Sequence, residues 1–167
     1  MPAPHKALVT AWRLLRDRLP TCDNLRKMKI TLEEEKLQCS FCHEHSESSN
    51  HLFAICSRTQ EMWNAIQKWL GVFTARPRSV TAHWMMFCCF GNEKKIRRLL
   101  KMVWVGSCWI LWKKRNDKRF EGKKWTVEDV ILEIKARTWC WYKTFGIFDK
   151  EMNFSVWSSE DLISRVM

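Results

Sequence analysis

Hydrophobic residues recur every three or four positions along much of this chain, and that spacing predicts helices. In the first such stretch the shared hydrophobic face consists of Leu8, Ala11, Trp12, Leu15 and Leu19. Pro20 is expected to end this helix, because proline lacks an amide hydrogen and crowds the preceding turn. Thr21 is then placed to cap a second, short helix that runs through Leu25 toward Met28.

The polar run 43–50 predicts a loop between helical segments. Beyond it, Ser49 is placed to cap a short helical turn, and Ser57 with Gln60 forms the capping-box pattern of a longer helix. Gly71 is expected to end that helix in the left-handed conformation. The stretch that follows has no hydrophobic period, so we expect a connection there.

The longest helical pattern extends from Glu93 to about Lys118. Its middle is hydrophobic on almost every side, which predicts a central, buried helix. Gly122 should end this helix, and Thr126 should cap a final helix that ends at Gly146. The residues after it carry weak signals and are expected to form a partly loose tail.

The most specific chemical signal is a set of three cysteines and one histidine, namely Cys39, Cys42, His51 and Cys56. A Cys-x2-Cys turn and a His-x4-Cys step supply the four ligands of a tetrahedral zinc site. Because protein side chains fill all four positions, the pattern predicts a structural zinc ion, not a catalytic one. His43 and His45 are alternative ligands, but only His51 begins a hydrophobic turn that presents its ring together with Cys56. Buried thiols without a metal are the simpler alternative.

These patterns together predict a mainly α fold, a small helical domain with a zinc-pinned Cys-Cys-His-Cys hairpin near the N-terminus. We divide the chain into a zinc-binding region, a connection, a basic two-helix region that packs on the first, and a tail, at residues 1–75, 76–92, 93–146 and 147–167.

The net charge of +11 points to an anionic partner, with nucleic acid ahead of an acidic membrane surface. Most of the excess comes from twelve basic residues around the longest helix: Lys94, Lys95, Arg97, Arg98, Lys101, Lys113, Lys114, Arg115, Lys118, Arg119, Lys123 and Lys124. Side chains at this density can neutralise several phosphates, and the adjacent Trp112 and Trp125 could stack on unpaired bases. Alternatively, these charges only keep a hydrophobic helix soluble.

The eleven tryptophans are expected to serve mainly as core residues, in particular those on hydrophobic helical faces, Trp12, Trp63, Trp69, Trp104 and Trp141. Trp84 lies in an unusually hydrophobic run and could instead belong to an exposed patch for a partner.

The cysteines outside the metal set are odd in number, which argues against a disulfide framework. Cys22, Cys88 and Cys140 are poor candidates for a nucleophile, because only His83 lies near any of them. The sequence lacks a secretory signal pattern. Its longest hydrophobic run, 102–112, is shorter than the roughly 20 residues that a membrane helix needs. We therefore expect a reduced, intracellular protein, nuclear or cytoplasmic and not secreted.

Three blocks of sequence resemble a known family. Residues 4–25 are similar to the opening of the reverse-transcriptase zinc-binding domain, and residues 39–63 are similar to its metal-binding signature. This domain lies at the carboxyl end of the polyproteins of plant LINE-type, non-LTR retrotransposons. Residues 112–122 are similar to a tryptophan–basic–Arg-Asn and Phe-x-Gly pattern that often follows. The paired aspartates of the polymerase palm are missing, so the resemblance implies a detached terminal domain and not a polymerase.

We therefore expect a non-catalytic, zinc-stabilised domain that binds RNA or single-stranded DNA with low sequence specificity. The alternative is a protein-interaction module, reused by the host as an adaptor or regulator, that acts through a hydrophobic surface. We expect neither membrane binding nor a small-molecule substrate.

Overall fold

The computed structural model describes residues 1–146 and 152–166, and over these residues it is helical without any strand. The predicted mainly α fold is therefore confirmed. In chain order the helices are α1 His5–Leu15, α2 Cys22–Lys27, the 3-10 turn η1 Glu34–Leu37, the π-turn η2 His51–Ile55, α3 Ser57–Leu70, α4 Val80–Cys89, α5 Lys94–Glu121, α6 Val127–Phe145, α7 Phe154–Ser158 and α8 Leu162–Val166. None of the helices within the described ranges is long and hydrophobic enough to cross a membrane.

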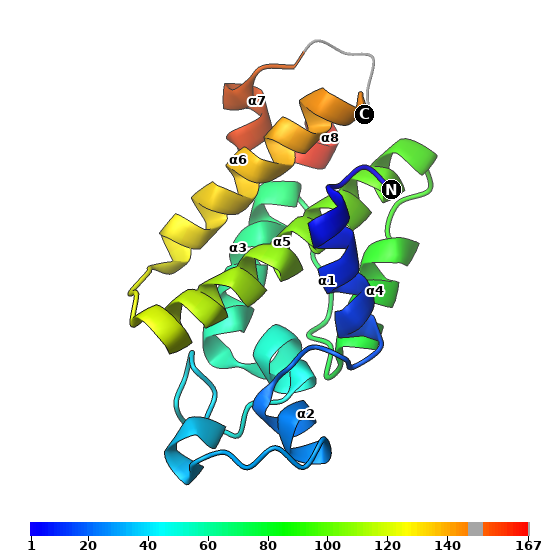
Figure 1. Ribbon diagram of the computed structural model, residues 1–167. Coiled ribbons are helices and arrows are strands. Elements are labelled where there is room, and N and C mark those ends of the chain that lie inside the picture. Colours follow the sequence, from blue (N-terminus) through cyan, green and yellow to red (C-terminus); the bar gives the residue numbers. More distant parts are fainter. Residues whose placement is uncertain (147–151, 167) are drawn as a thin grey trace.

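Helix α5 forms the centre of the molecule and contacts α1, α4 and α6 (Figure 1). Its middle is buried on every side, as its sequence predicted, and Trp104 is fully enclosed. Gly106 of α5 packs closely against α6, where a Cβ atom would lie only 2.8 Å from the Thr138 side chain. Glycine is therefore required for α5 and α6 to pack this tightly.

Helix α1 ends at Leu15, well before Pro20, because Asp17 adopts a positive φ of 51° that turns the chain. Its buried stripe consists of Ala7, Ala11 and Leu14. Trp12 lies outside this stripe and is 50% exposed, so its predicted place in the core was wrong. The other tryptophans predicted for the core are buried, namely Trp63, Trp69, Trp104 and Trp141.

Helix α4 lies within the segment 76–92 that the sequence pattern suggested was a connection. Its residues are hydrophobic on several sides, so no helical period was apparent, but Ser79 caps it by accepting a hydrogen bond from the Ala82 amide at 3.1 Å. Trp84 packs edge-on against Trp104 with ring centroids 4.8 Å apart. Trp84 is therefore half-buried, whereas Met85 in the same hydrophobic run is exposed.

The C-terminal segment folds back on the helical body where the structure describes it. Trp157 is fully buried, donates from Nε1 to the Lys135 carbonyl at 3.0 Å, and accepts at its own carbonyl from Trp69 at 2.6 Å. Met152, Trp157, Leu162 and Ile163 are thus buried within the segment that the sequence predicted to be a partly loose tail. The remaining tail residues, 147–151 and 167, lie outside the described part of the chain.

Most predicted helix ends agree with the structure. Thr126 and Asp129 form a reciprocal capping box at the start of α6. Gly71, Gly122 and Gly146 adopt positive φ angles at the ends of their helices. Thr21 does precede α2, but its hydroxyl makes no capping hydrogen bond.

Candidate metal centre

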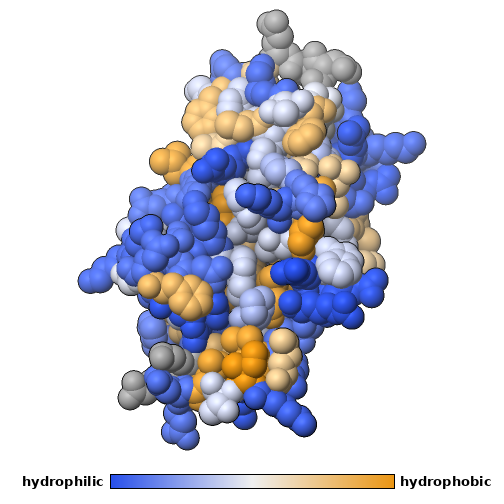
Figure 2. Space-filling view, in the orientation of Figure 1, coloured by the Kyte–Doolittle hydropathy of each residue, from blue (hydrophilic) through white to orange (hydrophobic). Residues whose placement is uncertain are grey.

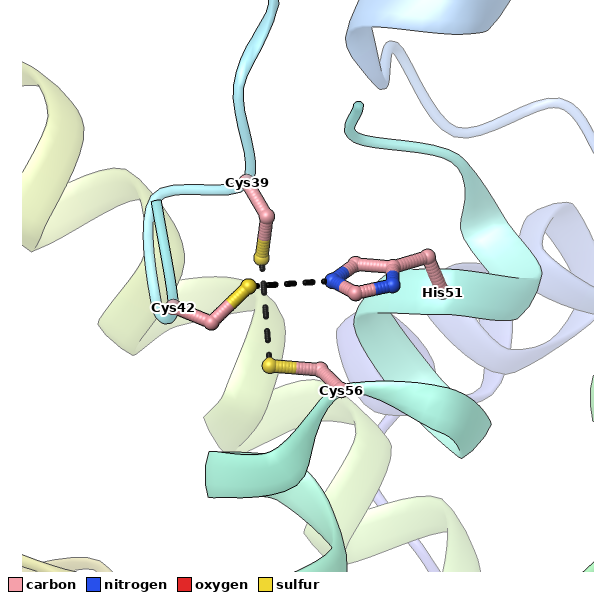
Figure 3. Close-up of side chains that lie close together, drawn as sticks. All are labelled: Cys39, Cys42, His51 and Cys56. Carbon is pink, nitrogen blue, oxygen red and sulfur yellow. Dashed lines mark hydrogen bonds between the residues drawn. The ribbon is translucent and has the colours of Figure 1, made fainter. Parts of the chain in front are cut away.

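The first two donors of the predicted set lie on a tight hairpin. A single antiparallel bridge joins Gln38 to Ser46, and the Cys39 amide donates to the His45 carbonyl at 2.7 Å. The Phe41 amide points at the Cys39 sulfur at 3.4 Å, so the turn itself supports a negatively polarised thiol. This backbone arrangement places Cys39 and Cys42 side by side, facing the following helix (Figure 3).

The other two donors lie on a π-turn, in which the Cys56 amide donates to the His51 carbonyl at 2.8 Å. Residues five positions apart are about 140° apart around an α-helix, whereas an i to i+5 turn returns them to nearly the same side. The π-turn is therefore what allows His51 and Cys56 to face one point. Ser48, not the predicted Ser49, caps this turn by accepting from the His51 amide at 3.1 Å.

Helix α3 begins directly after Cys56, which itself occupies the N-cap position. The predicted capping box of Ser57 and Gln60 is therefore wrong, because the helix starts one residue earlier than that pattern requires. Ser49 does not cap the π-turn; its hydroxyl instead donates to the Asp17 carboxylate at 2.7 Å.

All four predicted donor atoms lie within 4.8 Å of one another. The Cys39 and Cys56 sulfurs are 3.9 Å apart, and the Cys42 sulfur is 3.3 Å from Nε2 of His51 (Figure 3). A tetrahedral zinc ion with bonds of about 2.3 Å to sulfur separates its sulfur ligands by about 3.8 Å. The donor set, its spacing and its burial therefore fit a zinc ion.

The alternative histidines lie at the rim of this cluster. His43 and His45 are exposed, and the His45 ring centroid is 5.2 Å from that of His51. His45 belongs instead to a second, more exposed group with Cys42 and Glu44. The structure thus favours His51 as the nitrogen donor of the four-residue set.

The surroundings of the Cys56 thiol, at the start of α3, favour its ionisation. Cys39 donates a hydrogen bond to Cys56 and lowers the pKa of Cys56 to about 5, against the opposing effect of burial. The backbone amides of Thr59 and Arg58 act in the same direction, as expected at a helix N-terminus. The same hydrogen bond raises the pKa of Cys39. A metal ion would replace the thiol proton that the two sulfurs share.

The hairpin is attached to the end of α5 by a buried carboxylate. Glu47 is fully buried, and its two oxygens accept from Arg115 at 2.5 and 3.1 Å. Arg119 donates to the same carboxylate at 3.2 Å, and the Cys22 amide contributes a further contact at 3.3 Å. Burial alone would raise the pKa of Glu47, but the hydrogen bonds and charge of Arg115, with the charge of Arg119, lower it overall.

This arrangement corrects one part of the predicted nucleic-acid surface. Arg115 is only 3% exposed, so the prediction that it contacts nucleic acid is wrong. Lys118 and Arg119 are half-buried and face the hairpin, since Lys118 donates to the Phe41 carbonyl at 3.4 Å. Lys114 pairs with Glu133 at 2.8 Å. Lys118 and Arg119 therefore join α5 to the hairpin, and Lys114 joins α5 to α6.

The other basic residues of the set lie at both ends of α5. The exposed members are Lys94, Lys95, Arg98, Lys113, Lys123 and Lys124, and Arg97 and Lys101 are half-buried. The helix is about 40 Å long at the standard rise per residue, so the two groups do not form one compact site.

Trp112 and Trp125, predicted to stack on bases, instead pack partly against the metal-binding segment. The Trp112 ring lies 6.5 Å from that of Phe53, with the Arg115 guanidinium 4.8 Å from its centroid. Trp125 meets Phe41 edge-on at 4.9 Å.

Sequence reasoning missed Glu47 entirely, because a single acid in a polar run gives no local signal of burial.

The comparisons with known proteins agree with the geometry of the centre. Residues 1–63 match the family model described as zinc-binding in reverse transcriptase, and this part of the chain is a reverse-transcriptase zinc-binding domain. The matched region contains all four donors and ends within α3. Neither the curated proteins nor the solved structures contain a match to the chain.

Proposed function

We propose that this chain is a non-catalytic, zinc-stabilised helical module that binds RNA or single-stranded DNA with low sequence specificity. We further propose that it derives from the end of a plant LINE-type retrotransposon polyprotein, as the sequence resemblance implies. The observation that supports the zinc-stabilised fold most strongly is the convergence of four donor atoms within 4.8 Å.

Zinc is the ion that suits this set best, because three thiols and one imidazole are typical ligands of closed tetrahedral zinc sites. All four positions come from the protein, which leaves no coordination position for a water or a substrate. Structural zinc contributes roughly 10–16 kcal/mol of apparent binding energy near neutral pH. That is comparable to the roughly 5–15 kcal/mol by which whole domains are stable, so the ion would help to fold the hairpin.

The zinc proposal is tested by the metal content of the purified protein. We expect about one equivalent of zinc per chain in the wild type and a loss of most of it in Cys39→Ser. Cys140→Ser is the matched control, because Cys140 is an exposed cysteine outside the donor set. An unchanged metal content in Cys39→Ser would rule out this site.

The support for nucleic acid is the net charge of +11 together with exposed basic side chains at the start of α5. Lys94 and Arg98 lie one helical turn apart there, on a segment without acidic residues in its first turn. The description of the matched family adds support, since reverse transcriptases act on nucleic-acid templates. Low specificity is expected because phosphate contacts do not distinguish sequences.

A titration of labelled RNA and single-stranded DNA at several salt concentrations tests this proposal. Affinity should fall steeply with salt, and Lys94→Gln/Arg98→Gln should reduce the logarithmic salt slope by about 2. Arg58→Gln/Lys68→Gln removes the same charge from α3 and serves as the control, because these side chains already pair with Glu61 and with Glu160. Absence of binding even at low salt would overturn the proposal.

A hydrophobic groove supports protein interaction as a second candidate function. It has a volume of about 490 Å³, and its lining includes Leu25, Leu32, Trp112 and Phe120. Figure 2 shows hydrophobic side chains gathered at the lower end of this face, over the region of α2. If a partner binds here, Phe120→Ser should abolish its binding while leaving the salt-dependent affinity for RNA unchanged.

A further inference from the structure

Helix α1 presents an aromatic ring to solvent beside the basic residues that follow it. Trp12 is 50% exposed although its neighbours Ala11 and Leu14 are buried. The guanidinium carbons of Arg16 and Arg18 lie 5.9 and 6.0 Å from the centroid of its ring. Neither the helix core nor the metal centre uses this side chain.

The arginines around Trp12 are not neutralised by nearby acids. Among the residues that the structure describes, Arg13, Arg16 and Arg18 form no ion pair. The carboxylate of Asp17 lies between them in sequence, but it is already engaged by Lys27 at 3.1 Å. Ser49, at 2.7 Å, also holds this carboxylate. The positive charge of the three arginines is therefore available to an external anion.

A surface hollow lies next to this ring, between the end of α1 and α2. Its volume is about 580 Å³, within the usual range of ligand pockets, and Trp12, Arg13, Arg18, Pro20 and Met28 contribute to its lining. Asn24 stiffens one wall, because its amide donates to the carbonyls of Asp17 and Leu19 at 2.8 and 3.0 Å. The hollow is thus preformed, and it combines an exposed aromatic ring with guanidinium groups that lie close to it.

We propose that this hollow is a binding site for single-stranded nucleic acid, in which one base stacks on Trp12 and the flanking phosphates contact Arg13, Arg16 and Arg18. The inference rests on the proposed nucleic-acid function and places part of it on α1. An aromatic face beside several guanidinium groups matches the alternation of flat bases and charged phosphates in an unpaired strand. An acidic peptide would use the arginines but would leave the ring without a stacking partner.

The test uses the full, zinc-loaded chain and a fluorescein-labelled U12 RNA, with binding followed by anisotropy. Trp12→Ala should weaken binding about tenfold, and Trp12→Phe should restore most of the affinity, because stacking contributes several-fold to more than a hundredfold per base. Phe73→Ala is the matched control, since Phe73 is an exposed aromatic residue, at 79%, outside the hollow. Circular dichroism and zinc content establish that each variant is folded.

A second measurement separates stacking from charge. Wild-type protein should bind dT12 about tenfold more tightly than the same strand with abasic sites, and Trp12→Ala should bind both strands equally. Photocrosslinking of iodouridine-labelled U12 to the wild type should place a crosslink at Trp12, a result that does not depend on how any variant folds.

Each contrary outcome has a distinct meaning. If wild-type protein binds U12 but Trp12→Ala and Phe73→Ala behave alike, with crosslinks elsewhere, this site is refuted and the proposed function stands. If wild-type protein does not bind U12 at low salt, both this site and the proposed nucleic-acid function are refuted. If a twelve-residue polyglutamate peptide binds as tightly as U12 and loses the same affinity in Trp12→Ala, the hollow is a site for an acidic protein segment.

Discussion

The two ends of α5 carry similar basic residues but use them in opposite ways. At the start, Lys94 and Arg98 extend into solvent. At the end, Arg115 is buried against the fully buried Glu47 of the metal-binding hairpin. The difference depends on one acid that is 68 positions away in the sequence, so a count of charges along the helix cannot reveal it. In a basic cluster, the residues that pair with acids of the same chain therefore have to be separated from the unpaired ones before the cluster is assigned to a ligand.

Removal of the metal should produce the largest difference between the two ends. A strong chelator should increase amide hydrogen exchange over residues 38–56 and over the last turns of α5, because the hairpin that covers them loses its cross-link. The centre of α5 should stay protected, since hydrophobic contacts enclose it. Mass-spectrometric exchange measures this, and uniform protection after zinc has left would contradict the structural role of the ion.

The next largest difference between the two ends of α5 should be the loss of stability when a single arginine is substituted. Arg115→Ala should lower the free energy of unfolding by about 3–5 kcal/mol, because Glu47 would remain buried without its main partner. Arg98→Ala should change it by no more than about 0.5 kcal/mol, as is usual for an exposed position. Urea denaturation measures both values. Equal effects would show that the buried ion pair is not a special feature of the C-terminal end.

Acid should weaken the end of α5 through Glu47. Its pKa is lowered in the folded protein relative to the usual 4.5. The unfolded chain therefore takes up the proton first, and the stabilisation is complete above about pH 4.5 and lost as the pH falls through the folded pKa. Glu47→Gln should be less stable than wild type at neutral pH, and the gap should narrow in acid. Denaturation curves between pH 3 and 7 measure it; a constant gap would contradict this prediction.

The smallest effect is expected for the exposed ion pair near the same end. Lys113 lies 3.5 Å from Glu133 and is well exposed, so Lys113→Ala should cost less than about 1 kcal/mol. Thermal denaturation at low and high salt measures this effect, which should disappear at high salt. A loss comparable to that of Arg115→Ala would mean that burial does not decide the contribution of these pairs.

Local signals in the sequence were sufficient for most helices and for the four candidate ligands. The capping box at Thr126 and the left-handed glycines at 71, 122 and 146 depend only on nearby residues, and they appear as predicted. The Cys-x2-Cys turn likewise determines much of its own geometry.

Features that depend on distant contacts could not be predicted in this way. Trp12 follows the hydrophobic period of α1, but the close packing of Ala7 and Ala11 against the body turns it outward. Helix α4 has hydrophobic residues on several faces, so periodicity alone did not identify it. The burial of Glu47 required knowledge of where Arg115 lies in space.

The family match ends at residue 63, part-way along α3, whereas the buried carboxylate of Glu47 depends on a guanidinium from residue 115. A fragment truncated at that boundary would expose the inner face of a divided helix and would lack both arginines that pair with Glu47. We therefore expect a segment that extends through the end of α5 to be more stable than one that ends at residue 63, because only the longer segment keeps the buried ion pair.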